Sequence, residues 1–166
     1  MSIRIRFALT ALAALALAGC STFSIVGLAP GKSTEADVRR ALGEPAKTFT
    51  LPDGSRQLAY PTGPGGTQTY MAQVSANGSL TRLEQVLVEE KFRMVRPGTT
   101  TADEIERLIG PPWQKIAFAN KGQVAWDYVY LDTWDYLVDL SVMVDGRGIV
   151  QEMVHARRTR GDSGHR

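Results

Sequence analysis

The strongest constraint on the fold of this chain is an internal duplication. Residues 29–45 match residues 96–112 at a spacing of 67, the distance from Ala29 to Arg96. After a one-residue shift, the match continues to the paired turn motifs Asn77-Gly78 and Asp145-Gly146. Self-similarity held over most of a chain predicts two copies of one structural unit.

Each copy opens with a pattern that is typical of a short helix. Thr34 with Asp37, and Thr101 with Glu104, have the spacing of a capping box, in which hydroxyl and carboxylate satisfy early backbone amides. A glycine and then a proline close each segment, as expected at a helix end. Because neither copy has the complete Walker pattern G-x-x-x-x-G-K-[ST] or a G-x-G-x-x-G pattern, the glycines predict helix ends and not phosphate loops.

Strands are expected after each helix. Alternating apolar residues and turn motifs predict a three-stranded antiparallel meander in each copy. The predicted strands are 55–60, 67–75 and 79–89 in the first copy, and 123–131, 136–144 and 148–156 in the second. The predicted fold class is therefore α+β, with two tandem repeats, each a short helical opening packed on a three-stranded meander. Since one half buries little apolar surface alone, we expect a shared core or one six-stranded sheet.

The N-terminal residues have the features of an export signal. Arg4 and Arg6 precede an apolar run at 7–17, and two small residues follow it. Eleven apolar residues are too short to cross a hydrocarbon core of about 30 Å, so the segment 1–19 is predicted to be a secretory signal peptide and not a membrane span.

Cys20, the single cysteine of the chain, follows this signal directly. Leu17-Ala18-Gly19-Cys20 resembles the bacterial lipobox, which implies cleavage before Cys20 and acylation of its thiol and its new amine. Several acyl chains anchor a protein far more firmly than a single one. Ser21 stands where an aspartate would act as an inner-membrane retention signal, so the resemblance favours the outer membrane. The alternative is an ordinary signal peptide with a buried cysteine nearby.

Charge and composition exclude several functions. Residues 20–156 hold 13 of the 19 basic and 16 of the 17 acidic residues, so the body of the chain is slightly acidic. A nucleic-acid binder needs a basic face, and none is expected here. One cysteine and two histidines leave little for a metal centre, so we expect no metal and no cofactor other than lipid on Cys20.

The helix motif, the meander and the lipobox together resemble the SmpA/OmlA (BamE-like) family of outer-membrane lipoproteins, over about residues 28–156. The residues that match the motif are Gly31, Ser33, Thr34, Asp37, Val38, Leu42, Gly43 and Pro45, and Gly98, Thr100, Thr101, Glu104, Ile105, Ile109, Gly110 and Pro112. The resemblance implies a helical pair on a three-stranded sheet and an accessory role in β-barrel assembly. The tandem form is similar in architecture to β-lactamase inhibitor protein, whose concave sheet clasps an enzyme.

Two groups of residues are candidates for partner binding. Trp126, Tyr128 and Tyr130 share one face of a predicted strand, where they either pack beneath the helices or line an open binding face. Asp132, Trp134 and Asp135 lie in the loop that follows, as a charged aromatic tip. Nearby carboxylates at 127 and 139 are expected on a solvated face, and His155 has no evident nucleophile partner, so we predict no catalytic residues.

These observations predict a non-enzymatic lipoprotein that is anchored to the outer membrane and faces the periplasm. The expected organisation is a signal peptide (1–19), a lipidated linker (20–27), two BamE-like repeats (28–90 and 91–156) and a disordered basic tail (157–166). We expect a protein-binding scaffold in outer-membrane assembly or envelope integrity, with a barrel-assembly subunit as partner and with the loop 61–66 also taking part. The alternative is a lipid-anchored inhibitor that holds a periplasmic hydrolase in a concave tandem sheet. No small-molecule substrate is expected.

Overall fold

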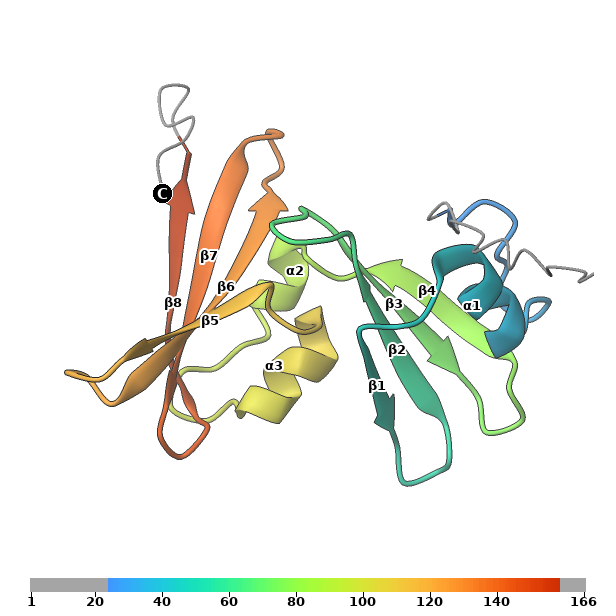
Figure 1. The fold of residues 1–166 in the computed structure, drawn as a ribbon, viewed down its shortest axis with the longest axis horizontal. Coiled ribbons are helices and arrows are strands. Elements are labelled where there is room, and N and C mark those ends of the chain that lie inside the picture. The colour runs from blue at the N-terminus through green and yellow to red at the C-terminus, as the bar shows by residue number, and fades with distance from the viewer. Residues whose placement is uncertain (1–23, 159–166) are drawn as a thin grey trace, which may run out of the picture.

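The computed structural model, which describes residues 24–158, consists mainly of two four-stranded antiparallel sheets (Figure 1). The strand orders are β1-β2-β3-β4 and β5-β6-β7-β8. The elements are α1 (Glu35–Leu42), β1 (Lys47–Thr50), β2 (Arg56–Pro61), β3 (Thr69–Val74), β4 (Leu80–Gln85), α2 (Glu89–Phe92), α3 (Ala102–Ile109), β5 (Gln114–Phe118), β6 (Gln123–Leu131), β7 (Leu137–Asp145) and β8 (Val150–Arg157).

The predicted α+β class with three-stranded units is wrong. Each unit has four strands, the helices are few and short, and the fold is mostly β. The additional strands, β1 and β5, directly follow α1 and α3 and pair with the first strand of each meander, Lys47 with Ala59 and Gln114 with Asp127. With four and five residues, they are too short to show a clear alternation. The expected six-stranded sheet is also wrong, because the two sheets are separate.

The capping boxes form as the sequence predicts. The Thr34 hydroxyl accepts from the amide of Asp37, whose carboxylate accepts from the amide of Thr34. Thr101 and Glu104 repeat both bonds at α3. Each capping box gives a hydrogen-bond partner to two backbone amides that have none within the helix. α1 and α3 therefore begin at equivalent positions of the two repeats.

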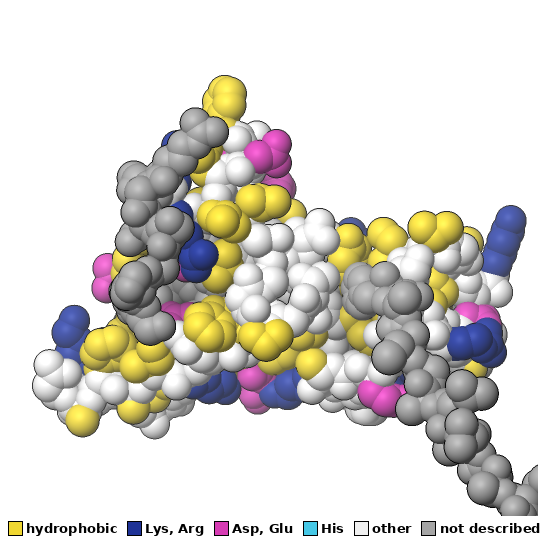
Figure 2. Space-filling model, turned by 45° about the horizontal axis from the view of Figure 1, so that its top comes forward, with side chains coloured by type: hydrophobic (Ala, Val, Ile, Leu, Met, Phe, Trp, Pro, Cys, Tyr) yellow, Lys and Arg dark blue, Asp and Glu magenta, His cyan; other side chains and the backbone are white. Residues whose placement is uncertain are grey.

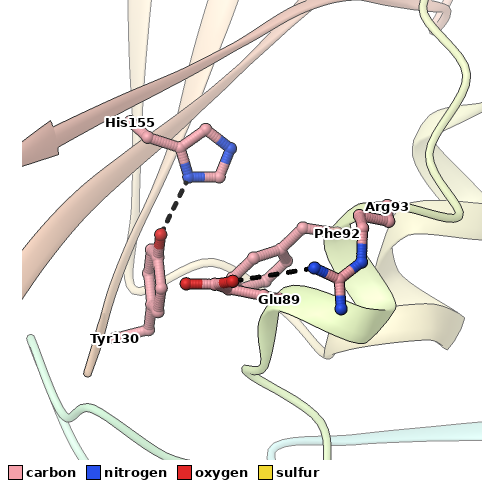
Figure 3. Close-up of a pocket in the computed structure, with 5 residues that line it drawn as sticks. All are labelled: Glu89, Phe92, Arg93, Tyr130 and His155. Carbon is pink, nitrogen blue, oxygen red and sulfur yellow. Dashed lines mark hydrogen bonds and ion pairs between the residues drawn. The ribbon is translucent and has the colours of Figure 1, made fainter. Parts of the chain in front are cut away.

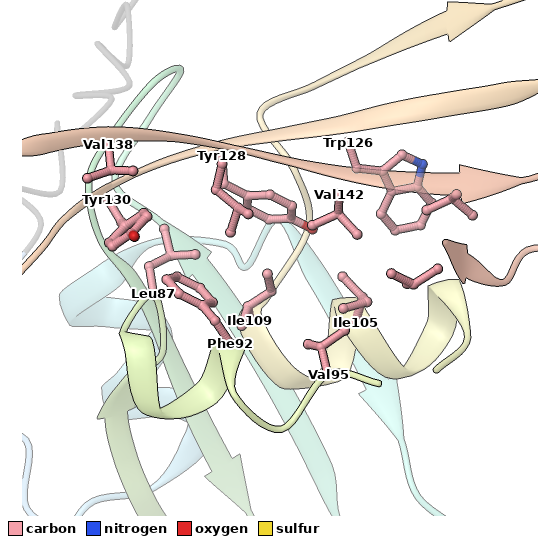
Figure 4. Packing of buried hydrophobic residues seen from close by; sticks show 13 residues of the cluster. Leu87, Phe92, Val95, Ile105, Ile109, Trp126, Tyr128, Tyr130, Val138 and Val142 are labelled. Atoms are coloured by element: carbon pink, nitrogen blue, oxygen red, sulfur yellow. The ribbon is translucent and has the colours of Figure 1, made fainter. Parts of the chain in front are cut away.

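The larger hydrophobic core belongs to the second repeat (Figure 4). It lies between the inner face of the second sheet and the helices α2 and α3. Its buried members are Leu87, Phe92, Val95, Ile105, Ile109, Trp126, Tyr128, Tyr130, Val138, Leu140, Val142, Val144 and Val150. A smaller cluster joins α1 to the first sheet through Val38 and Leu42.

Helix α3 also lies beside the first sheet, on the face opposite to the one that α1 covers (Figure 1). The Glu106 carboxylate, 5% exposed, forms ion pairs with Lys47 of the first sheet and Lys115 of the second. The Gln57 side-chain amide donates to the carbonyl of Arg107 at 2.8 Å. The order of layers is α1, first sheet, α2 with α3, second sheet.

Several predicted features lie outside the described residues. These are the signal peptide, Cys20 with its lipid, the start of the linker, and the tail from residue 159. Arg157, which the sequence analysis assigns to the tail, is the last residue of β8. Among residues 24–158, no helix has both the length and the apolar character to cross a membrane.

Candidate functional site

The aromatic row of β6 packs beneath the helices, which is one of the two placements that the sequence leaves open. Trp126, Tyr128 and Tyr130 are 8%, 3% and 4% exposed. The Tyr128 hydroxyl donates to the carbonyl of Gly110 at 3.1 Å, and burial raises its pKa. The Lys115 ammonium lies 3.6 Å from the centre of a Trp126 ring. Trp126 and Tyr128 therefore form core structure and are not available as a binding face.

The loop between β6 and β7 is fixed by the carboxylate of Asp132, which is 7% exposed. One of its oxygens accepts from the amides of Trp134 and Tyr136, at 2.9 and 3.0 Å. The other forms an ion pair with Arg157 at the end of β8. Burial opposes the charged form, but these donors outweigh it, so the pKa of Asp132 lies below its ordinary value. Asp132 is thus a positioning residue of the loop.

The loop holds Trp134 out into solvent, with 75% of its surface exposed. Asp135 adopts a positive φ of 60°, which aspartate tolerates better than most residues and which reverses the chain after the tryptophan. Tyr136 is 52% exposed, and the Arg157 guanidinium lies 4.6 Å from its ring centre. Hydrophobic side chains gather at this projecting end of the second repeat, with acidic ones beside them (Figure 2).

A pocket of about 310 Å³ opens at the same end of the second sheet, between α2 and β8 (Figure 3). Its lining residues are Glu89, Phe92, Arg93, Tyr130 and His155. The Phe92 and Tyr130 rings meet edge to face at 4.7 Å between centres, and the Tyr130 hydroxyl is 3.1 Å from His155 Nδ1. Partial burial lowers the pKa of His155, and the charge of Glu89 opposes that shift.

Asp127 of β6 and Asp139 of β7 each have side-chain partners of their own. Asp127 accepts from the side chains of Gln114 and Ser141 on the outer face of the sheet, at 2.9 and 2.6 Å. Asp139 forms an ion pair with Arg158. Within residues 24–158, no group of three or more His, Cys, Asp or Glu side chains is placed to hold a metal ion.

Sequence reasoning missed the pocket because it missed α2. The segment 79–89 is predicted as one long strand, whereas β4 ends at Gln85 and a single helical turn begins at Glu89. The Glu-Glu-Lys run could have indicated a helix start. The other predicted recognition loop, 61–66, connects β2 to β3 in the first sheet.

Comparisons with known proteins add little. No protein-family model and no curated protein matches the chain. The crystal structure of a DUF4309 family protein (YjgB) from Bacillus subtilis is similar over 80% of this chain and 84% of that chain, with 21% identity and a TM-score of 0.31. A likeness at this score carries no argument about function. The resemblance to the SmpA/OmlA family remains an inference from sequence motifs.

Proposed function

We propose that this chain is a non-enzymatic lipoprotein, anchored to the outer membrane through acyl chains on Cys20, whose folded repeats bind another envelope protein in the periplasm. Its role is that of a scaffold in outer-membrane assembly or envelope integrity. The lipobox and the export signal support the anchoring, and the site at the end of the second sheet supports the binding.

The exposed Trp134 on its preformed loop is the observation that carries the binding role. An indole that is 75% exposed contributes little to folding, yet the Asp132 carboxylate holds the loop backbone by accepting hydrogen bonds from the amides of Trp134 and Tyr136. Tryptophan is enriched among the residues that dominate binding energy, and a loop ordered in advance loses less entropy on association. With Tyr136 beside it, Trp134 forms an aromatic tip suited to a pocket on a protein partner.

The test is site-specific photocrosslinking in cells. A benzophenone amino acid replaces Trp134, and a matched chain carries it at Arg147, an exposed position in the hairpin at the opposite end of the same sheet. We expect one dominant crosslinked envelope protein at position 134 and none at 147, with its identity read by mass spectrometry.

The identity of that protein separates the candidate roles. A barrel-assembly subunit supports the scaffold, and a soluble periplasmic hydrolase supports the inhibitor role in its place. Equal crosslinking at both positions, or none at position 134, contradicts a binding role for the loop.

A further inference from the structure

The free edge of β8 lies beside the pocket, and the two features share one residue. In the described part of the chain, β8 pairs with β7 alone. Residues 154–157 are all exposed, although successive side chains of a strand point to opposite faces. Solvent therefore reaches both faces and the edge of this strand end. His155 belongs both to this edge and to the pocket lining.

The backbone groups that face the edge can be assigned from the hydrogen-bond pattern. The amide of Arg158 donates to the carbonyl of Leu137 on β7, at 2.8 Å. Because backbone groups alternate in direction along an antiparallel strand, the N–H and C=O groups of Met153, His155 and Arg157 point away from β7. A further strand placed beside β8 would pair with these groups.

The same three residues direct their side chains to the inner face of the sheet, since they pair with Val142, Leu140 and Val138 of the core. A residue directly opposite His155 on an added strand would have its side chain on that face too, beside the pocket. The pocket walls there are the rings of Phe92, Tyr130 and His155, with centres 4.7 to 5.9 Å apart.

β8 also offers the longest uncharged stretch among the four edge strands of the two sheets. Charged residues on an edge strand discourage the addition of another strand. All four edge strands carry charge: Lys47 in β1, Arg82 in β4, Lys115 in β5, and Glu152 and Arg157 in β8. β8 is the longest edge strand at eight residues, and its stretch from Met153 to Ala156 has no formally charged residue.

We infer that an extended segment of a partner protein adds to the second sheet beside β8 and places an aromatic side chain in the pocket between α2 and β8. Backbone bonds to Met153, His155 and Arg157 would supply affinity, and the pocket would supply specificity. An aromatic ring fits because three of the five lining residues, Phe92, Tyr130 and His155, are rings that can pack edge to face with it. The inference rests on the proposed binding function and names the chemistry of its partner.

The test uses the full-length ¹⁵N-labelled protein in detergent and a nine-residue peptide in which threonine and valine alternate around a central phenylalanine. Two comparison peptides carry serine in place of phenylalanine, or N-methyl groups along the edge that would face β8. We expect amide shifts at Met153, His155 and Arg157, and a loss of affinity of about 10-fold or more with either comparison peptide.

Protein variants locate the binding to the pocket. His155 is exposed, so His155→Ala should fold, and it should reduce the preference for phenylalanine over serine. His155→Phe should restore that preference by rebuilding the ring wall. Val154→Ala, on the outer face of the same strand, is the matched control and should bind as the unaltered protein does.

Three results would each overturn the inference. They are amide shifts confined to β5 or to the outer face of the sheet, equal affinity for the phenylalanine and serine peptides, and no binding at millimolar peptide. None of these results would affect the crosslink expected at position 134. If the peptide binds as expected but no crosslink forms at position 134, only the proposed role of the loop is contradicted.

Discussion

The junction between the repeats makes a specific prediction for Gly110→Ala. Gly110 follows α3 with a φ of +84°, and a Cβ at this position would lie 2.6 Å from Cγ2 of Thr69 in the first sheet. Thr69 is 1% exposed, and its β-branched side chain has little freedom to turn away. Gly98→Ala is the matched control, because Gly98 has a φ of +80° and nothing within 4 Å of its Cβ position.

The two glycines have nearly equal φ, and the two substitutions differ in what the new Cβ would contact. Placing an alanine in the left-handed region destabilises by about 1–2 kcal/mol at either position. Overpacking at the repeat junction adds about 1–3 kcal/mol for Gly110→Ala. We therefore expect a loss of about 2–5 kcal/mol in the free energy of unfolding for Gly110→Ala, against about 1–2 kcal/mol for Gly98→Ala.

Urea denaturation followed by circular dichroism measures both losses, with a double-mutant cycle through Thr69→Ser. That change removes the clashing methyl group and by itself costs about 1 kcal/mol. In the double mutant, most of the additional loss of Gly110→Ala should disappear. Equal losses at Gly98 and Gly110, or a double mutant that is simply additive, would refute the contact between α3 and the first sheet.

Three further predictions concern single groups. Tyr128→Phe should lower the free energy of unfolding by about 1–3 kcal/mol, because it leaves the Gly110 carbonyl without its hydrogen-bond donor. Tyr60→Phe should be neutral or stabilising, since the buried Tyr60 hydroxyl has no hydrogen-bond partner. Urea denaturation of both variants compares the two effects. The pKa of Asp132 is lower in the folded protein than its ordinary value of 3.8. The carboxylate therefore contributes fully to the order of the loop above pH 3.8, and this contribution is lost as the pH falls through the folded pKa. Acid titration followed by the fluorescence of the loop tryptophan should show this transition, and Asp132→Asn should abolish it. Cys20→Ala should release a folded protein into the soluble periplasm, and unchanged membrane fractionation would contradict lipid anchoring.

The features that could be predicted from the sequence are those set by local chemistry. The capping pairs Thr34 with Asp37 and Thr101 with Glu104 identify both helix starts, because the reciprocal bonds need only a three-residue spacing. The strand predicted at 123–131 has the observed bounds of β6, since nine alternating residues leave one consistent face. The duplication gives the common order of elements in both halves.

The missed features depend on tertiary contacts. β1 and β5 become strands by pairing with β2 and β6, and their own four or five residues carry too little pattern to show it. α2 is a single turn whose Phe92 packs on Tyr130, so its position is decided by the second core. The sequence predicts the site in part. The expected tip at Trp134 is exposed, but the burial of Trp126 depends on helices that lie elsewhere in the chain.

The position of α3 between the sheets has a consequence for the order in which the two halves of the chain fold. Truncation after the first repeat would uncover the apolar face formed by Ala59, Met71 and Val86, which are each at most 1% exposed. Loss of the first repeat would leave Glu106 without Lys47 and the Arg107 carbonyl without Gln57. Because the first half is synthesised first, these apolar side chains stay exposed to solvent until the second half has been made and has packed against them.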